Sequence, residues 1–251
     1  MIICRTKNEL DLALDTLSKK PGKLALIPTM GNLHHGHLSL IKIAKKNASK
    51  TISTIFVNPL QFAQNEDFDK YPRTHDEDIK KLNHEGCDIL FIPRDNKEVF
   101  SSIENAQTIN SGVLGSELCG KIRPGHFDGV LTVVNRLFEI IDPDVAVFGE
   151  KDLQQLLIIK KMVSDLGLPI EIRSGATQRA EDGLALSSRN QYLSAAERAI
   201  APKLWSTLTA CAESLASASQ NSIETILASS RGELESAGFA LDYFELCGLP
   251  M

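Results

Sequence analysis

The sequence lacks long apolar runs, blocks of basic residues and paired cysteines. Its apolar runs are short pieces such as residues 88–93 and 156–159, far below the ~18–20 residues of a membrane-spanning helix. The N-terminal stretch carries charges from Arg5 onwards, which leaves no apolar core for a signal peptide. These absences predict a soluble protein that is neither exported nor held in a membrane.

The charge balance is mildly acidic, with 27 Lys and Arg against 32 Asp and Glu, a net charge of −5. This excludes the basic surface by which proteins usually bind nucleic acid or anionic membranes. Five cysteines are scattered through the chain without a CxxC pair: Cys4, Cys87, Cys119, Cys211 and Cys247. Unpaired thiols of this kind are typical of a reducing compartment, so we expect a cytoplasmic location.

Apolar segments bounded by turn residues alternate with segments of helical period. The expected strands are 24–28, 51–59, 88–93, 144–149 and 169–175, and the expected helices are 38–48, 73–84, 130–141 and 153–166. Strands that are apolar almost throughout are buried on both faces, so this alternation predicts an α/β domain, a doubly wound, Rossmann-like parallel sheet. Ligands bind at the carboxyl ends of such strands, which are the loops after Pro28, Asn58 and Gly149.

The pattern changes after residue 176. Helical segments at 194–215 and 222–236 precede a last short strand at 242–246. We therefore expect a larger domain at 1–176 and a smaller α+β domain at 177–251.

Three histidines and two glycines follow the first of these strands, in PTMGNLHHGH at 28–37. A helix beginning here would attract phosphate through its N-terminal N–H groups. His34 and His37 lie three residues apart, on one helix face, and both rings could donate to one phosphate. Capping or solvated histidines and a metal site are the alternatives, although no cysteine lies nearby to complete a structural zinc site.

Three further loops carry polar groups suited to a substrate or a phosphate. Asn58 and Gln61 present neutral amides around Pro59, Lys151 lies within residues 149–152, and Ser187-Ser188-Arg189 combine hydroxyls with a guanidinium. Each loop alone is as well explained by an ordinary turn or helix start. The sequence has no GxxxxGK[ST], GxGxxG, GxSxG or HExxH motif, so the phosphate site would be built from histidine, lysine, serine and arginine.

Taken in order, PTMGNLHHGH, FVNPLQF, YPRT, LCGKIRPGHFDGVLTVV, GEKDLQQ and DGLALSSRN closely resemble the pantothenate synthetase (pantoate–beta-alanine ligase) family, densely over about residues 24–190. The resemblance implies the HxGH nucleotidyltransferase fold of class I aminoacyl-tRNA synthetases. It also implies a two-step reaction, in which pantoate and ATP give pantoyl adenylate and pyrophosphate, and beta-alanine then displaces AMP. Mg²⁺, without an assignable protein ligand, and a homodimer are further implications.

By this resemblance His37, His34 and Lys151 are the catalytic residues. The family labels His37 a proton donor, but we expect a stabilising role because pyrophosphate is already a good leaving group. Gln61, Gln155 and Asn58 would bind pantoate, with Gln61 also next to beta-alanine. The implied nucleotide contacts are Met30, Gly31, Asn32, Leu33, His34, His35, Gly36, His37, Gly149, Glu150, Lys151, Asp152, Gln178, Leu186, Ser187, Ser188 and Arg189.

The sequence departs from the family pattern at several positions. His35, Leu153, Leu186 and Gln178 replace its usual residues, and the chain stops at Met251 where relatives continue through a further hairpin, so we expect a shortened lid domain. Two alternatives remain: a related adenylyltransferase that leaves AMP on its product, and a non-catalytic nucleotide-binding regulator. Length and acidic charge disfavour a tRNA-charging enzyme.

Overall fold

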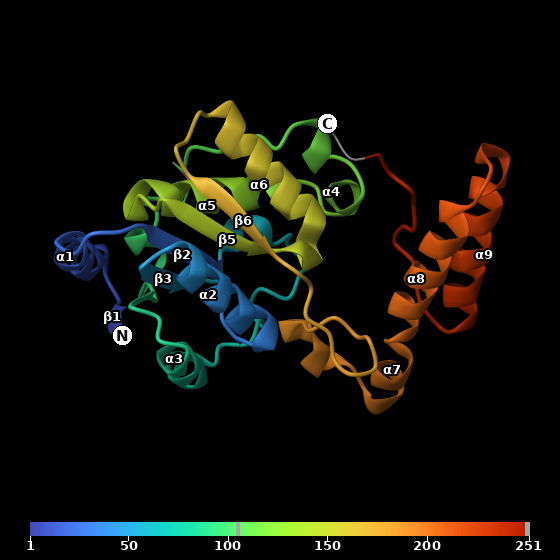
Figure 1. Ribbon diagram of the computed structural model, residues 1–251, viewed down its shortest axis with the longest axis horizontal. Coiled ribbons are helices and arrows are strands. Elements are labelled where there is room, and N and C mark those ends of the chain that lie inside the picture. The colour runs from blue at the N-terminus through green and yellow to red at the C-terminus, as the bar shows by residue number, and fades with distance from the viewer. Residues whose placement is uncertain (104–105, 249–251) are drawn as a thin grey trace. The chain divides into compact units, whose positions relative to one another are not determined.

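The computed structural model describes residues 1–103 and 106–248 and divides the chain into two compact units, Met1–Thr177 and Gln178–Met251 (Figure 1). The first unit is built on a sheet of six strands in the order β1-β4-β3-β2-β5-β6, and every neighbouring pair is parallel. The strands are β1 (Ile2–Cys4), β2 (Leu24–Thr29), β3 (Lys50–Ile55), β4 (Ile89–Phe91), β5 (Val145–Gly149) and β6 (Glu171–Gly175). The expected doubly wound α/β fold is confirmed.

Helices cover both faces of this sheet. Helices α1 (Lys7–Ser18), α5 (His126–Ile141) and α6 (Leu153–Asp165) share one hydrophobic cluster with the sheet, and α2 (His35–Asn47) and α3 (His75–His84) share the other. A short helix, α4 (Cys119–Ile122), precedes α5. Strand β3 is buried at every position because both faces of the sheet are covered, although its sequence, KTISTI, includes four polar residues.

The order of the strands determines where a ligand can bind. The chain runs outward from β2 through β3 to β4, and then returns to the other side of β2 with β5 and β6. The topological switch therefore lies between β2 and β5, and ligands of such sheets bind at the carboxyl ends of the strands beside it. The loops after β2, β3 and β5 meet at this edge.

The second unit contains α7 (Ala195–Ile200), α8 (Lys203–Ala216) and α9 (Ile223–Ser236). The single helix expected at 194–215 is divided at Pro202, which cannot donate a helical hydrogen bond. The strand expected at 242–246 is wrong, because this segment has no partner strand among the described residues. Instead Phe244 is buried and its carbonyl accepts from Arg231 Nε. The described part of this unit has helices, loops and one isolated antiparallel bridge, Arg179–Ala185, but no strand, so the α+β expectation for it is corrected.

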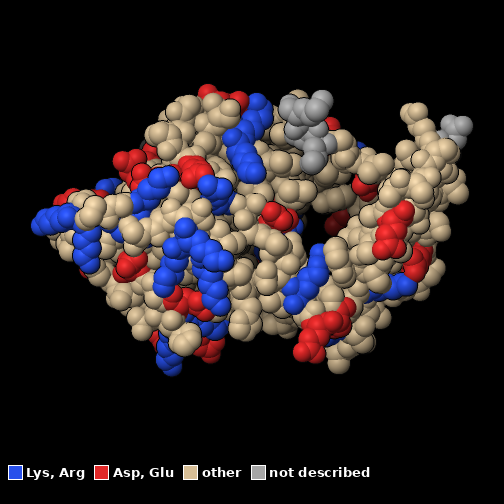
Figure 2. Space-filling model, viewed as in Figure 1, with Lys and Arg blue, Asp and Glu red and all other residues tan. Residues whose placement is uncertain are grey.

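Sequence patterns alone did not reveal β1 or α1 at the N-terminus. Thr6 caps α1 by accepting from Glu9 N, and the Glu9 carboxylate accepts from Thr6 N, which completes a capping box. Within the described ranges, no helix is long and apolar enough to cross a bilayer. On the face shown in Figure 2, Lys and Arg side chains are interspersed with Asp and Glu.

Candidate active site

The two histidines of the HHGH motif hold each other in place at the start of α2. His34 is the N-cap residue, and its Nδ1 accepts from Gly36 N at 3.1 Å. His37 Nδ1 accepts from His34 N at 3.2 Å, and the two ring centroids lie 4.1 Å apart. Both histidine rings therefore cap the start of α2, which was one of the alternatives considered for this motif. The first amides of α2, which we expected to be free for phosphate, already donate within the chain: Gly36 N to His34 Nδ1 and His37 N to the His34 carbonyl.

Both imidazoles are neutral at physiological pH. Burial lowers the pKa of His34 to about 4 and the pKa of His37 to about 3, and the ammonium groups of Lys151 and Lys81 act in the same direction. Because each Nδ1 accepts a backbone hydrogen bond, the single ring proton of each histidine lies on Nε2. The motif thus presents two N–H donors that carry no positive charge.

The loop after β3 is held by Asn58, whose side chain is almost completely buried. Asn58 Nδ2 donates to Gln61 Oε1 at 3.2 Å and to the Gly129 carbonyl at 3.1 Å, and Asn58 Oδ1 accepts from Leu60 N. These contacts fix the short helix η1 (Pro59–Gln61) against α5. Asn58 therefore positions Gln61 in addition to lining the pocket described next.

A pocket of about 80 Å³ opens between the sheet edge, η1 and α5. Asn58, Gln61 and Gln155 contribute amides to its lining, and Thr54 contributes a hydroxyl. Its apolar wall consists of Pro28, Phe56, Val130, Val133, Val134, Leu137 and Phe148. Thr54 Oγ1 is buried without a hydrogen-bond partner in the described parts of the chain. The pocket suits a small molecule with both methyl groups and hydrogen-bonding groups.

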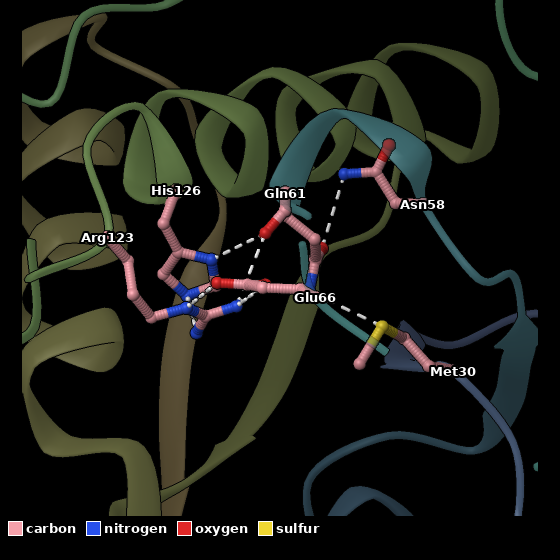
Figure 3. A network of polar contacts seen from close by, with 6 residues as sticks. All are labelled: Met30, Asn58, Gln61, Glu66, Arg123 and His126. Atoms are coloured by element: carbon pink, nitrogen blue, oxygen red, sulfur yellow. Dashed lines mark hydrogen bonds and ion pairs between the residues drawn. The ribbon is translucent and has the colours of Figure 1, made fainter. Parts of the chain in front are cut away.

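A polar network behind Gln61 was not assigned any role from the sequence (Figure 3). Arg123 makes a bidentate ion pair with Glu66, at 2.6 Å from Nε and 2.5 Å from Nη2. Arginine can only donate, so its Nη1 donates to His126 Nε2 at 3.1 Å, and His126 Nδ1 donates to the Gln61 carbonyl at 2.8 Å. Gln61 Nε2 in turn contacts Met30 Sδ at 3.3 Å. The network connects Gln61 with the loop after β2.

Lys151 supplies a cation at the same edge of the sheet. It lies in the short helix η4 (Glu150–Asp152) directly after β5, and its Nζ is 3.1 Å from Asp152 Oδ1. The Lys151 side chain is 37% exposed, and Glu150 accepts from Ser174 Oγ. The cation is therefore accessible, and it acts on the pKa values of both histidines.

Five of the predicted nucleotide contacts lie in the second unit. The Gln178 carbonyl accepts from Leu186 N, which closes a loop. Ser187 Oγ accepts from Arg189 N and caps the short helix η5 (Ser188–Tyr192). Ser188 is buried and Arg189 is exposed. One compact segment thus contains all five residues of this group, Gln178, Leu186, Ser187, Ser188 and Arg189.

The profile of the family described as pantoate-beta-alanine ligase matches residues 2–250. The chain belongs to this family. Its relatives include the pantothenate synthetases of Neisseria meningitidis serogroup C, 53% identical over 230 residues (91% of this chain, 81% of that one), and of Psychrobacter arcticus, 49% identical over 239 residues (95% and 82%). The expected pantoate–beta-alanine ligase, an enzyme of pantothenate biosynthesis, is thereby confirmed.

Solved pantoate–beta-alanine ligases share the fold. The Thermus thermophilus pantothenate synthetase matches with a TM-score of 0.89 at 39% identity, covering 97% of this chain and 86% of that one. The Francisella tularensis enzyme matches with a TM-score of 0.82 at 35% identity, covering 99% and 90%, and was solved with beta-gamma ATP and beta-alanine. Both comparisons extend across the two units of this chain.

The described residues contain no group of three or more His, Cys, Asp or Glu that could hold a metal ion. Asp76, Glu77 and Asp78, at the start of α3, differ in environment: the first two are exposed, and Asp78 is fully buried. This donor set does not fit a protein-built magnesium cage, so we derive no step through such a site.

Proposed function

We propose that this ligase activates pantoate as an adenylate at the carboxyl edge of its sheet. A pantoate carboxylate oxygen attacks the α-phosphorus of ATP, and the bond from that phosphorus to the pyrophosphate oxygen breaks. The beta-alanine amine then attacks the acyl carbon, the bond to AMP breaks, and the amine loses a proton. The observation that carries this proposal is the pair of neutral histidines, with protonated Nε2 atoms, beside Lys151 and the apolar and amide-lined pocket.

In this proposal His34 and His37 stabilise charge by donating Nε2–H bonds to phosphate oxygens. A ring whose pKa is about 3 is not an effective proton donor at neutral pH, so His37 acts as a hydrogen-bond donor. Lys151 adds a mobile positive charge. Fixed donors of this type lower the barrier of an in-line displacement because they need no reorganisation in the transition state.

Pantoate would fill the pocket beside η1. Its two methyl groups would pack on the apolar wall, including Val130 and Val134, and its oxygens would bond to the amides of Gln61 and Gln155. Arg123 and His126 both donate to the Gln61 carbonyl and hold its backbone in place. This supports Gln61 as a fixed residue that contacts both pantoate and beta-alanine.

The nucleotide would complete its contacts in the second unit. We propose residues 1–176 as the nucleotide- and pantoate-binding domain and 177–251 as a lid that contributes Gln178, Leu186, Ser187, Ser188 and Arg189. Magnesium would come with ATP, since it is usually held largely by phosphate oxygens and water. The homodimer and the cytoplasmic location stay predictions.

Pantoate-dependent release of pyrophosphate from Mg-ATP tests the first step. Addition of beta-alanine should then yield AMP and pantothenate. His37→Ala should reduce pyrophosphate release by about 10²–10³-fold with the fold retained, whereas His84→Ala, a change of an exposed histidine, should leave pyrophosphate release unaltered. Wild-type turnover in His37→Ala would contradict the assigned role. ATP binding without pyrophosphate release would favour a regulator, and AMP retained on the product would favour an adenylyltransferase.

A further inference from the structure

Asp78 is a fully buried carboxylate that lies beside the histidine motif without belonging to it. It is on the first turn of α3, and its side chain is 0% exposed. Asp78 Oδ2 accepts from Asn32 N and Oδ1 from Leu33 N, each at 2.8 Å, and Oδ2 also accepts from Thr74 Oγ1 at 3.1 Å. Three donors therefore converge on one carboxylate.

The backbone that Asp78 binds is in an unfavourable conformation. Gly31 has φ 87° and Asn32 has φ 48°, the left-handed region that costs a side-chain-bearing residue free energy. Successive N–H groups in such a segment point to one side and form a concavity that binds anions. Here the anion is Asp78 itself, so the amides of Asn32 and Leu33 are used within the chain.

The loop is held at a second point by the same helix. Lys81 Nζ, one turn after Asp78, donates to the Leu33 carbonyl at 2.7 Å. The peptide group on each side of Leu33 is thus bonded to α3, and the next residue is His34, the N-cap of α2. The position of the His34 ring, and of the His37 ring that it contacts, depends on where this loop lies.

We propose that Asp78 is a positioning residue for catalysis: it holds the loop at 31–33 so that the Nε2–H groups of His34 and His37 point at the nucleotide phosphates. The proposal rests on the function proposed above. Asp78 is buried and bonded to the loop, and it differs in this from Asp76 and Glu77, its neighbours on the same helix turn, whose side chains are exposed.

The test compares Asp78→Asn with Glu77→Gln, which removes the same charge from an exposed neighbouring position. Asparagine keeps the size of the side chain but turns an NH₂ group toward a backbone donor. Losing one hydrogen bond to a charged acceptor should lower the fraction of molecules with the loop in place about 10- to 100-fold. In pyrophosphate release, kcat/KM for ATP should fall by the same factor. KM for beta-alanine should not change, and Glu77→Gln should match the wild type. In Asp78→Asn the Asn32 and Leu33 amides should exchange hydrogen faster.

Three results would overturn the proposal. A lower melting temperature with wild-type kcat/KM, measured well below that temperature, would make Asp78 purely structural. Recovery of full activity at high Mg²⁺ would make it a metal ligand. Unchanged exchange at Asn32 and Leu33 would show that it does not hold the loop. Absence of pyrophosphate release from the wild type would instead refute the proposed function, so the two failures are distinguishable.

Discussion

Replacement of Gly129 by alanine should damage the pantoate pocket more than it damages the fold. Gly129 lies in α5 where the helix meets η1, and an added Cβ would lie 2.1 Å from the Leu60 carbonyl oxygen and 2.8 Å from Gln61 N. Ordinary contact begins at 3.4 Å, so the loop must move by 3.4 − 2.1 = 1.3 Å. A displacement of about 1 Å at a positioning group can reduce the rate about 100-fold.

The effect on stability should be smaller. Overpacking costs about 1–3 kcal/mol, and alanine in place of glycine in a helix returns about 1 kcal/mol, so the net loss is about 0–2 kcal/mol. Steady-state kinetics with varied pantoate should show kcat/KM lowered about 100-fold. The matched control is Gly232→Ala in α9, where an added Cβ meets nothing within 4 Å; it should be slightly stabilising and leave activity unchanged. A Gly129→Ala enzyme with wild-type kcat/KM for pantoate would refute the reasoning.

Three further predictions concern buried or partly buried polar groups. Burial lowers the pKa of His37 from its usual 6.5 to about 3. Its contribution to the free energy of unfolding is therefore full above pH 6.5 and is lost toward pH 3, at about 1.4 kcal/mol per pH unit. In urea unfolding, the free energy of unfolding of His37→Gln should depend less steeply on pH than that of the wild type, and an equal slope would contradict this. Glu66→Gln removes the charged partner of Arg123. Because Arg123 and His126 hold Gln61, KM for pantoate should rise about tenfold. An unchanged KM would show that this network does not affect pantoate binding. Thr54→Val removes a buried hydroxyl that has no hydrogen-bond partner among the described residues and should stabilise the fold by about 1 kcal/mol in urea unfolding; destabilisation would show that the hydroxyl has a partner.

The local sequence pattern was sufficient to predict most helices and strands of the first unit. The strands beside the switch point are buried on both faces, so their apolar runs distinguish them clearly from the amphipathic helices between them. The turn from β2 into α2 was also predictable, because glycine and a capping side chain at His34 occur where the chain reverses. The strand expected at 242–246 is wrong because this short segment only buries Phe244 against α8 and α9, and a few residues rich in aromatic and apolar side chains cannot be distinguished from a strand by sequence alone.

The supporting residues of the site were not predictable in the same way. Asp78 is one of three consecutive acidic residues at the start of α3, a pattern common at helix N-termini, yet its carboxylate accepts from Leu33 N, 45 positions earlier in the chain. Glu66 and Arg123 are 57 positions apart, and nothing in the local spacing of either points to the other. The IRPGH stretch, quoted for its family resemblance, was the one available signal for Arg123 and His126.

The central position of β2 has a consequence for how the protein is made. Its hydrogen bond from Leu24 N to Asp144 Oδ2 joins residues 120 positions apart, and β5 pairs along the same edge. At about 5–20 residues per second, translation needs roughly 6–24 s to travel from one to the other. During that interval β2 has an unpaired apolar edge that can pair with another chain. A nascent chain halted before residue 145 would carry the histidine motif without β5, the strand that pairs with the open edge of β2.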